Sequence, residues 1–401
     1  MPEFLFANGW TTHQARAAMM LDANVANLNT GSFGPLPKAV FERVTELRRR
    51  LAEEPMDFLV RQGGPQLWQS RQKLAGFLGA DPYRLVFTPN VSSAINIVAS
   101  GLTLAGPGEV LLTDHEYGAM HWCWERATQR QGLTLRTFPL PVTAEDPAEI
   151  VAAFRKAMNE RTRLLFFSHV LSPTGLVLPA KEICAETRKR GIMTLIDGAH
   201  APALVPLELD RLECDFYTGN CHKWLLAPTG SGFLYLGKGN EERLQSMHVS
   251  WGYRPNRRQL DVVDEWGTTP RLRFFEFEGF RDPCAWIAVK TAVEFQEQLG
   301  FERIRARNAE LVAHLRGRLG EIPQLQPITP VHPLLHGFMT AYRLPAGVMG
   351  LEWQRLLWDR HRIELAFPER PGFWIARVST HFYNTVDEID LLARALGEMV
   401  V

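Results

Sequence analysis

The chain has 401 residues, and this length predicts one large domain with a smaller one rather than a single ordinary core. Hydrophobic residues make up 46% and charged residues 22%, which is typical of a globular protein, and the formal net charge is zero. A neutral chain without a long apolar run is not expected to bind nucleic acid or a membrane. The five cysteines have no CxxC pair, which predicts a reducing, cytoplasmic location rather than a disulfide framework.

The first part of the chain alternates between predicted helices and strands. Phe41, Val44, Leu47 and Leu51 recur at helical spacing and predict an early amphipathic helix. Short apolar runs bounded by turn signals predict strands at residues 84–88, 109–114, 163–169, 193–197, 214–218 and 232–237. Helices are predicted at residues 92–102, 119–131, 146–158 and 179–190. This alternation is typical of an α/β fold in which a mostly parallel sheet is covered by helices on both faces.

The pattern changes after about residue 285. Long helical patterns are followed by short apolar runs and a closing helix, at 284–298, 301–319, 338–344, 362–367, 373–380 and 385–399. Elements in this order predict a smaller α+β domain with an antiparallel sheet. We therefore expect an N-terminal segment at 1–35, a large domain at 36–280 and a small C-terminal domain at 281–401.

Residues with useful chemistry follow the ends of successive predicted strands. Ser92 begins a helix, where free backbone amides attract anions, although an ordinary helix cap has the same sequence. His115 and Tyr117 follow the next strand, Asp197 ends a later one, and Lys223 follows the strand after that. Because ligands bind at the carboxyl ends of parallel strands, we expect one crevice to hold an anion cradle, an aromatic ring, an acid and an amine.

That inventory fits pyridoxal 5′-phosphate (PLP). Its phosphate needs a helix N-terminus, its ring nitrogen needs a carboxylate, and its aldehyde needs an amine. Burial and a neighbouring cation would lower the pKa of Lys223 and make its amine a usable nucleophile and base. The alternative is a structural lysine whose alkyl stem covers apolar surface. A metal site is not expected, because the histidines lack ligand spacing.

Several segments carry a resemblance to a known family: "LNTGSFGPLP" (28–37), "TPNVSSAIN", "TDHEYGAM", "SHVLSPTG", "LIDGAHAP", "TGNCHKWLLAPTGSGFLY", "GFRDP" and "RVSTHFYNTVDEID". Through them the chain resembles the class V, fold-type-I aminotransferase-like PLP enzymes, and most of all their isopenicillin N epimerase branch, which is related to cysteine desulfurases and cysteine-conjugate C–S lyases. The resemblance implies a large domain with a seven-stranded, mostly parallel sheet between helices, a smaller α+β domain, and a homodimer with shared active sites. It also implies that the N-terminal segment at 1–35 contributes to the active site and the small domain.

The resemblance also implies roles for individual residues. Lys223 would be the Schiff-base lysine, Asp197 would pair with the ring nitrogen, and His115 would stack on the ring unless Tyr117 takes that place. The residues expected around the cofactor are Val91, Ser92, His115, Tyr117, Ser172, Asp197, His200, Asn220, His222, Lys223 and Gly279. Of these, His200 would lie near the ring hydroxyl, and His222 and Ser92 near the phosphate.

Arg377 matches the arginine that binds the α-carboxylate of the substrate, and Asn29 would lie beside that carboxylate. The chain also departs from the family pattern at three positions. Phe280 stands where relatives usually have a threonine that reaches the partner subunit's phosphate, Asn220 replaces a phosphate-binding serine, and Ser172 replaces an asparagine near the ring hydroxyl. These departures affect the expected phosphate contacts and leave Lys223 and Asp197 unchanged.

The resemblance implies an enzyme that acts at the α and β carbons of a small amino-acid substrate, but it leaves the reaction open. A persulfide-type cysteine desulfurase is not expected, because no cysteine follows Cys284. We expect a C–S lyase, in which Lys223 removes the α-proton and a β-sulfur substituent leaves. An aminotransferase is one alternative, and another is an epimerase, which needs a second acid such as His115, Tyr117 or a water molecule. A protein that binds PLP or an amino acid without turnover is the alternative of another class.

Overall fold

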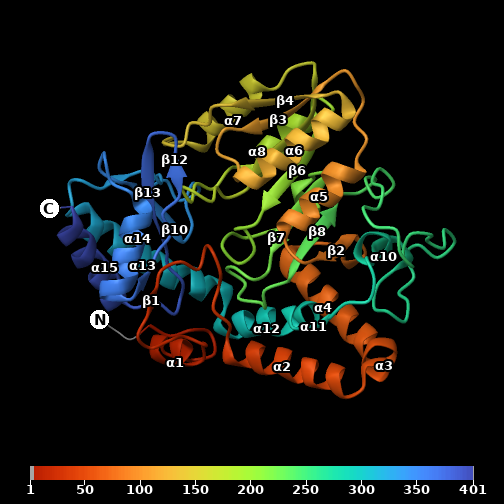
Figure 1. Cartoon of the computed structure of the whole chain (residues 1–401), viewed down its shortest axis with the longest axis horizontal. Coiled ribbons are helices and arrows are strands. Elements are labelled where there is room, and N and C mark those ends of the chain that lie inside the picture. The colour runs from red at the N-terminus through yellow and green to blue at the C-terminus, as the bar shows by residue number, and fades with distance from the viewer. Residues whose placement is uncertain (1–3, 401) are drawn as a thin grey trace.

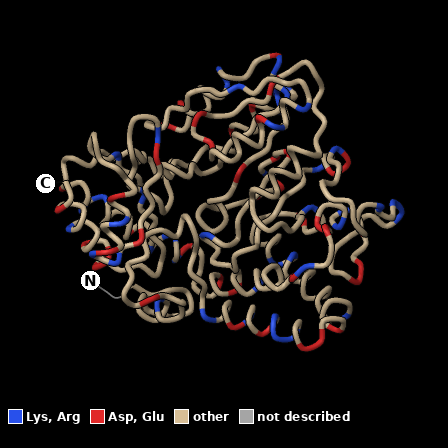
Figure 2. The backbone as a smooth tube through the Cα atoms, viewed as in Figure 1, with Lys and Arg blue, Asp and Glu red and all other residues tan. Residues whose placement is uncertain are grey.

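The computed structural model describes residues 4–400 as two lobes of unequal size (Figure 1). The larger lobe surrounds a seven-stranded sheet, and the smaller lobe holds a four-stranded sheet and the C-terminal helices. Lysine, arginine, aspartate and glutamate are interspersed over both lobes, which agrees with the zero net charge (Figure 2). Among residues 4–400, none of the helices combines the length and apolar character that a membrane span requires.

The large sheet confirms the predicted α/β fold. Its strand order is β2-β8-β7-β6-β5-β3-β4, and β8 runs antiparallel to both of its neighbours while the other pairings are parallel. The strands are β2 (Leu85–Thr88), β3 (Glu109–Thr113), β4 (Thr134–Phe138), β5 (Thr162–Ser168), β6 (Met193–Gly198), β7 (Phe216–Asn220) and β8 (Gly232–Leu236). The sequence prediction missed only β4, because this edge strand buries Phe138 alone and has no apolar run.

Helices cover both faces of the large sheet. The helices of this lobe are α2 (Lys38–Glu53), α3 (Pro55–Asp57), α4 (Gly63–Leu78), α5 (Val91–Gly101), α6 (Gly118–Gln131), α7 (Pro147–Ala157), α8 (Ala180–Arg188), α9 (Leu209–Leu212) and α10 (Pro270–Glu276), with a π-helical turn at Phe58–Gln62 and a 3-10 turn at Pro82–Arg84. On one face, α5 and α6 bury Ile95 and Trp124 against the sheet. On the other face, α4, α7 and α8 contribute Leu74, Ile150 and Ile183 to a second apolar cluster.

Local signals set the ends of several helices. At the start of α7, Asp146 and Glu149 form a capping box, and Thr385 and Glu388 form another at the start of α15 (Val386–Met399). Gly132 follows α6 at a φ of 65°, a left-handed conformation that glycine adopts without a Cβ clash. These residues satisfy backbone groups that a helix end leaves unpaired, so the boundaries follow from local chemistry.

The small lobe confirms the predicted antiparallel sheet. Its order is β12-β13-β10-β9, and it packs against α13, α14 and α15. The elements are β9 (Gln326–Pro327), β10 (Met339–Arg343), β12 (Glu369–Arg370), β13 (Phe373–Ser379), α13 (Phe301–Gly320), α14 (Gly350–His361) and α15. The apolar run at 362–367 forms only the short β11 (Ile363–Glu364), which pairs with β1 (Ala26–Asn27) after α1 (Thr12–Ala17). The N-terminal segment is therefore joined to the small lobe.

The chain segment that leads from the large lobe to the small lobe contains two helices where one was predicted. The pattern at 284–298 is divided into α11 (Cys284–Ile287) and α12 (Val289–Leu299). Their side chains, including Ala292, pack in the apolar cluster of the large sheet. The domain division at residues 280 and 281 stays a prediction.

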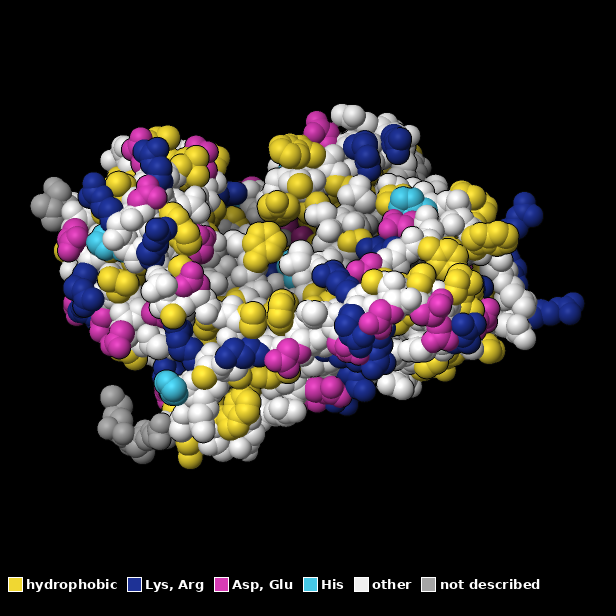
Figure 3. All heavy atoms as spheres, turned by 60° about the horizontal axis from the view of Figure 1, so that its bottom comes forward, with side chains coloured by type: hydrophobic (Ala, Val, Ile, Leu, Met, Phe, Trp, Pro, Cys, Tyr) yellow, Lys and Arg dark blue, Asp and Glu magenta, His cyan; other side chains and the backbone are white. Residues whose placement is uncertain are grey.

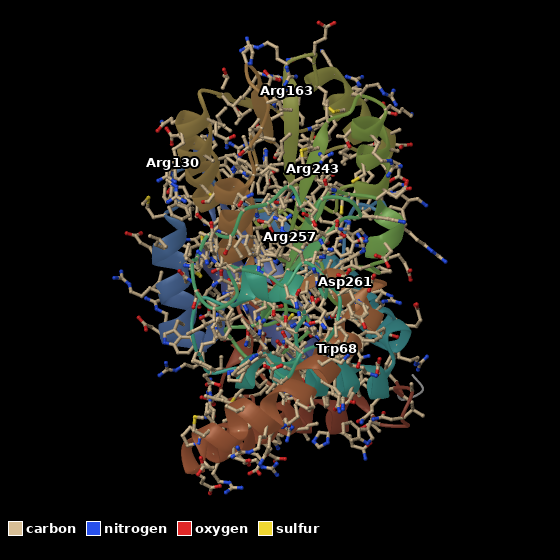
Figure 4. The ribbon with its side chains drawn as sticks, turned by 90° about the vertical axis from the view of Figure 1, so that its right-hand side faces the viewer. Trp68, Arg130, Arg163, Arg243, Arg257 and Asp261 are labelled. Atoms are coloured by element: carbon tan, nitrogen blue, oxygen red, sulfur yellow. The ribbon has the colours of Figure 1, made fainter. Side chains whose placement is uncertain are left out.

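A long irregular segment leads from β8 to α10. It contains Arg257 and Asp261, which lie above Trp68 of α4 when the molecule is viewed from the end of the large lobe (Figure 4). Arg271 of α10 donates to Asp261 at 3.1 Å and so ties the segment to the lobe. This segment lies at the far side of the large lobe from the small lobe (Figure 1).

Candidate active site

A cavity of about 400 Å³ lies at the carboxyl ends of the large sheet and reaches the small lobe. In the space-filling view, the surface is hollowed between the two lobes (Figure 3). The cavity is lined by Gly31, Ser32, Phe33, Pro89, Asn90, Val91, Ser92, Tyr117, Met120, Ser168, Val170, Ser172, Asp197, Ala199, His200, Asn220, His222, Lys223, Thr229, Gly230 and Arg377. The strand ends thus bring together residues that are far apart in the sequence, as expected for a mostly parallel sheet.

Lys223 follows β7, and its surroundings favour the neutral form of its amine. The indole N–H of Trp224 can only donate, so Nδ1 of His200 accepts from it at 3.4 Å. The neutral His200 ring therefore carries its proton on Nε2, which lies 3.0 Å from Lys223 Nζ. Only an unprotonated amine can accept a hydrogen bond from that N–H group. Burial, followed by the nearby charge of Arg377, lowers the pKa of Lys223 to about 7, against the opposing effect of Asp197.

Asp197 is the next-to-last residue of β6 and a buried carboxyl with one side-chain oxygen in a hydrogen bond. Its Oδ1 accepts the Ala199 N–H at 2.8 Å, and its backbone C=O accepts the His169 N–H at 2.8 Å. Burial raises the pKa of Asp197, while the Ala199 N–H and then Lys223 act to lower it. A cationic ring nitrogen at this position would supply the charge partner that a buried carboxylate requires.

The N-terminus of α5 forms a polar wall of the same cavity. Asn90 caps the helix by accepting the Ser93 N–H at 2.9 Å, and Val91 N–H donates to Asn220 Oδ1 at 3.0 Å. Asn220 replaces a serine in the family pattern. Its side-chain carbonyl accepts a hydrogen bond from the helix end, so its NH₂ group can still donate to another acceptor. With the Ser92 hydroxyl beside it, this wall fits a phosphate.

Arg377 of β13 lies buried on the small-lobe side of the cavity. Its Nη1 donates to Ser172 O at 2.9 Å and Oγ at 3.1 Å, and its Nη2 donates to Asn29 Oδ1 at 3.0 Å and Ser32 Oγ at 2.9 Å. Its Nε is buried without a partner, and among residues 4–400 no carboxylate pairs with this guanidinium. Burial lowers its pKa to about 10. An uncompensated buried cation facing a cavity is a site for a ligand carboxylate.

Three predicted site residues lie outside the cavity lining. His115 is turned to Asp114, with 2.7 Å between His115 Nδ1 and Asp114 Oδ1, whereas Tyr117 lines the cavity. Gly279 lies with Phe280 in a separate cavity of about 80 Å³. Asn29 does not line the cavity either, but it reaches the site through Arg377. The stacking role of His115 and the cofactor contact of Gly279 therefore lack support within this chain and stay predictions.

Sequence reasoning missed several residues that line the cavity. Ser168 is the last residue of β5, so its position at a strand end was the available signal. Thr229 and Gly230 lie in "APTGSG", which has the sequence of an ordinary turn. Phe33 reaches the cavity because the N-terminal segment packs on the lysine loop: a Cβ at Gly34 would lie 2.1 Å from Lys223 O. A methyl group there would separate the two segments, which explains the glycine.

The fold and this site define a PLP-dependent enzyme of fold type I. The family model "Aminotransferase class-V" matches residues 35–343, and the chain belongs to this family. It is 53% identical to "Isopenicillin N epimerase" of Streptomyces clavuligerus, over 96% of this chain and 98% of that protein. It is 51% identical to "Isopenicillin N epimerase" of Amycolatopsis lactamdurans, over 98% of this chain and 100% of that protein.

Two structures of the protein C-DES are similar to this chain at 26% identity and cover 94% of it. One is described as the cystine C–S lyase in complex with its product cysteine persulfide, with a TM-score of 0.82 and 98% of that chain covered. The other holds glycine covalently linked to the PLP cofactor, with a TM-score of 0.83 and 97% covered. These relatives agree with the predicted family and cofactor.

Proposed function

We propose that this protein is an epimerase that inverts the configuration of an amino-acid α-carbon, with isopenicillin N as its substrate. The observation that carries the proposal is the similarity to two isopenicillin N epimerases at 53% and 51% identity over nearly the whole of each chain. The C–S lyase that we expected from the sequence has weaker support, since C-DES is only 26% identical. The epimerase alternative is therefore the better one.

The residues of the cavity suit the first half of an epimerisation. PLP, when bound, supplies an aldehyde for the substrate amine and a ring that accepts electrons when the Cα–H bond breaks. Asp197 would hold the ring nitrogen, and the α5 end with Ser92 would hold the phosphate. Arg377 would bind the α-carboxylate and fix which Cα bond faces Lys223. Lys223, as a neutral amine with a pKa of about 7, would then accept the α-proton.

The second half requires a proton on the opposite face of Cα. We assign this donor to Tyr117, because it is the cavity-lining member of the two side chains considered from the sequence. Tyr117 is 57% exposed as a residue, so its phenol can exchange its proton with water between turnovers. His115 is engaged with Asp114 instead. A lyase has no need of this second donor, so the Tyr117→Phe variant bears on the choice of reaction.

The cysteines argue against persulfide chemistry. All five are free and buried in the structure, and burial raises the pKa of Cys221 and Cys284 above the ordinary thiol range. A nucleophilic cysteine needs a thiolate and access to the substrate. More distant relatives include the "Probable cysteine desulfurase" of Synechocystis, at 30% identity.

The test is incubation of the PLP-loaded protein with isopenicillin N in deuterated water. Epimerisation gives both configurations at the amino-acid stereocentre, with deuterium at Cα, and Tyr117→Phe should slow inversion more than it slows exchange of the α-proton. In parallel, cystine and cysteine are supplied, and pyruvate with released sulfide would favour the lyase. Lys223→Ala controls for background exchange. Absence of inversion together with rapid β-elimination would overturn the proposal.

We further propose a homodimer in the cytoplasm, as the family resemblance implies. The exposed Phe280 beside Gly279 is the segment expected to reach the partner subunit. Light scattering of the purified protein tests the dimer, and a monomer that epimerises at full rate would contradict shared active sites.

A further inference from the structure

Glu116 is a buried carboxyl next to the cofactor cavity that the proposed reaction does not use. It lies between the strands β3 and β5, with 9% of its surface exposed. One carboxyl oxygen, Oε1, lies 2.6 Å from Thr113 Oγ1, and the other, Oε2, lies 2.6 Å from Ser168 Oγ. Ser168 lines the cavity and is paired in register with Asp197 on the next strand. Ser168 therefore lies next to both Glu116 and Asp197, the carboxylate that is expected to face the cofactor ring.

The hydrogen-bond partners of Glu116 are compatible with a proton on its carboxyl group. Thr113 Oγ1 accepts the His115 N–H at 3.2 Å, so the Thr113 hydroxyl proton is free to point to Glu116 Oε1. At the other oxygen, either Ser168 donates to an ionised Glu116, or a protonated Glu116 donates to Ser168. In the second case, the Ser168 hydroxyl proton is released to point into the cavity.

Electrostatics favour the protonated form of Glu116. Among residues 4–400, no lysine, arginine or histidine side chain forms an ion pair or hydrogen bond with it. The charged group that faces it is Asp197, another carboxyl, and two buried carboxylates without a cation between them repel each other. Burial and, secondarily, Asp197 raise the pKa of Glu116 to about 8, while Ser168 and Thr113 act to lower it.

We propose that Glu116 is a neutral carboxylic acid that donates its proton to Ser168 Oγ, turns the Ser168 hydroxyl toward the cavity, and leaves Asp197 as the single carboxylate at the cofactor ring. Glu116 is then a positioning residue that acts through Ser168. The inference rests on PLP binding and not on epimerisation, so it can fail or hold separately from the proposed function.

The protonation of Glu116 can be measured without cofactor. Infrared spectra of the apoprotein at pH 7 should contain the C=O stretch of a protonated carboxylic acid that the Glu116→Gln variant lacks. Glu125→Gln, on the exposed side of α6, is the matched control and should change only the carboxylate bands. If Glu116→Gln removes carboxylate absorbance and leaves the carboxylic-acid band intact, Glu116 is ionised and the proposal is wrong.

The action through Ser168 is tested by PLP affinity and by the pH at which the absorbance of the lysine-linked cofactor changes, both measured without substrate. A glutamine amide donates to Ser168 and accepts from Thr113 as a neutral acid does, so Glu116→Gln should bind PLP within about twofold of wild type. Glu116→Ala and Ser168→Ala should each weaken binding by roughly fivefold, the worth of one hydrogen bond, and the double variant should lose no more than either.

Two results would overturn the proposal. One is a Glu116→Gln variant whose absorbance transition moves by about one pH unit or more, since that is the effect of deleting a full charge beside the site. The other is additivity of Glu116→Ala and Ser168→Ala, with a combined loss of roughly 25-fold in PLP affinity, because independent residues would not act through one hydroxyl.

Discussion

Replacement of Arg377 by methionine should abolish tight binding of the substrate carboxylate while leaving the cofactor in place. The guanidinium is buried, has no carboxylate partner among residues 4–400, and keeps Nε unpaired. A carboxylate bound by two charge-assisted hydrogen bonds gains about 3–6 kcal/mol in total, at about 1.5–3 kcal/mol each. Since about 1.4 kcal/mol is tenfold in affinity, Arg377→Met should weaken amino-acid binding by roughly 10²–10⁴-fold.

The assay is titration of the cofactor absorbance with an amino acid and with an amine of the same side chain that lacks the α-carboxylate. Arg377→Met should lose affinity for the first ligand alone, and Arg377→Lys should lie between, because an ammonium retains charge without the planar fork. Arg343→Met, at an exposed position of the neighbouring strand β10, is the matched control. Equal losses for both ligands would refute the reasoning, because the defect would then be in the cavity as a whole.

Loss of binding by Arg377→Met should not come from unfolding. Burial holds the pKa of Arg377 at about 10 instead of its higher ordinary value, which corresponds to a cost of about 3 kcal/mol for keeping the charge inside. Removing the charge removes that cost, and this offsets the hydrogen bonds lost to Ser172, Asn29 and Ser32. Urea unfolding of the wild-type and Arg377→Met apoproteins measures the difference in their free energies of unfolding, which should be small.

Three further predictions concern Lys223, the Arg71–Glu276 pair and the cysteines. Burial lowers the pKa of Lys223 from 10.5 to about 7, so between these pH values the unfolded chain binds one more proton than the folded chain. The unfolding free energy of the wild-type apoprotein, compared with that of Lys223→Met, should therefore rise with pH in this window by up to about 1.4 kcal/mol per pH unit. The same pH dependence of the unfolding free energy in both proteins would contradict the lowered pKa. Arg71 is fully buried and donates to both carboxylate oxygens of Glu276. Arg71→Met should therefore lower the free energy of unfolding in urea by about 3–5 kcal/mol, because it leaves the Glu276 carboxylate buried without its partner. A loss under about 1 kcal/mol would contradict this expectation. Cys221→Ser and Cys284→Ser variants that remain folded should keep catalytic activity, whereas loss of turnover with PLP still bound would restore the persulfide alternative.

The pattern of short apolar runs was sufficient to predict most strands of the large sheet. Six of the seven strands are buried on both faces, so they appear in the sequence as short continuous apolar runs. The exposed edge strand β4 lacks such a run, and α4, for which no helix was predicted, begins with two glycines and a proline, residues typical of turns. The division between α11 and α12 was also missed, because apolar residues continue through both helices.

The sequence alone determined that Asp197 and Lys223 would line one crevice, because parallel strands bring their carboxyl ends to one edge of a sheet. Asp197 lies near the end of β6, and Lys223 follows β7. The same argument predicted Ser92 and either His115 or Tyr117 at this edge, whereas only the tertiary structure decided the remaining positions. Arg377 reaches the cavity from the small lobe, Tyr117 lines it where His115 does not, and Glu116 lies behind Ser168. These positions depend on how the lobes pack and how loops turn, and no periodicity in the chain encodes either.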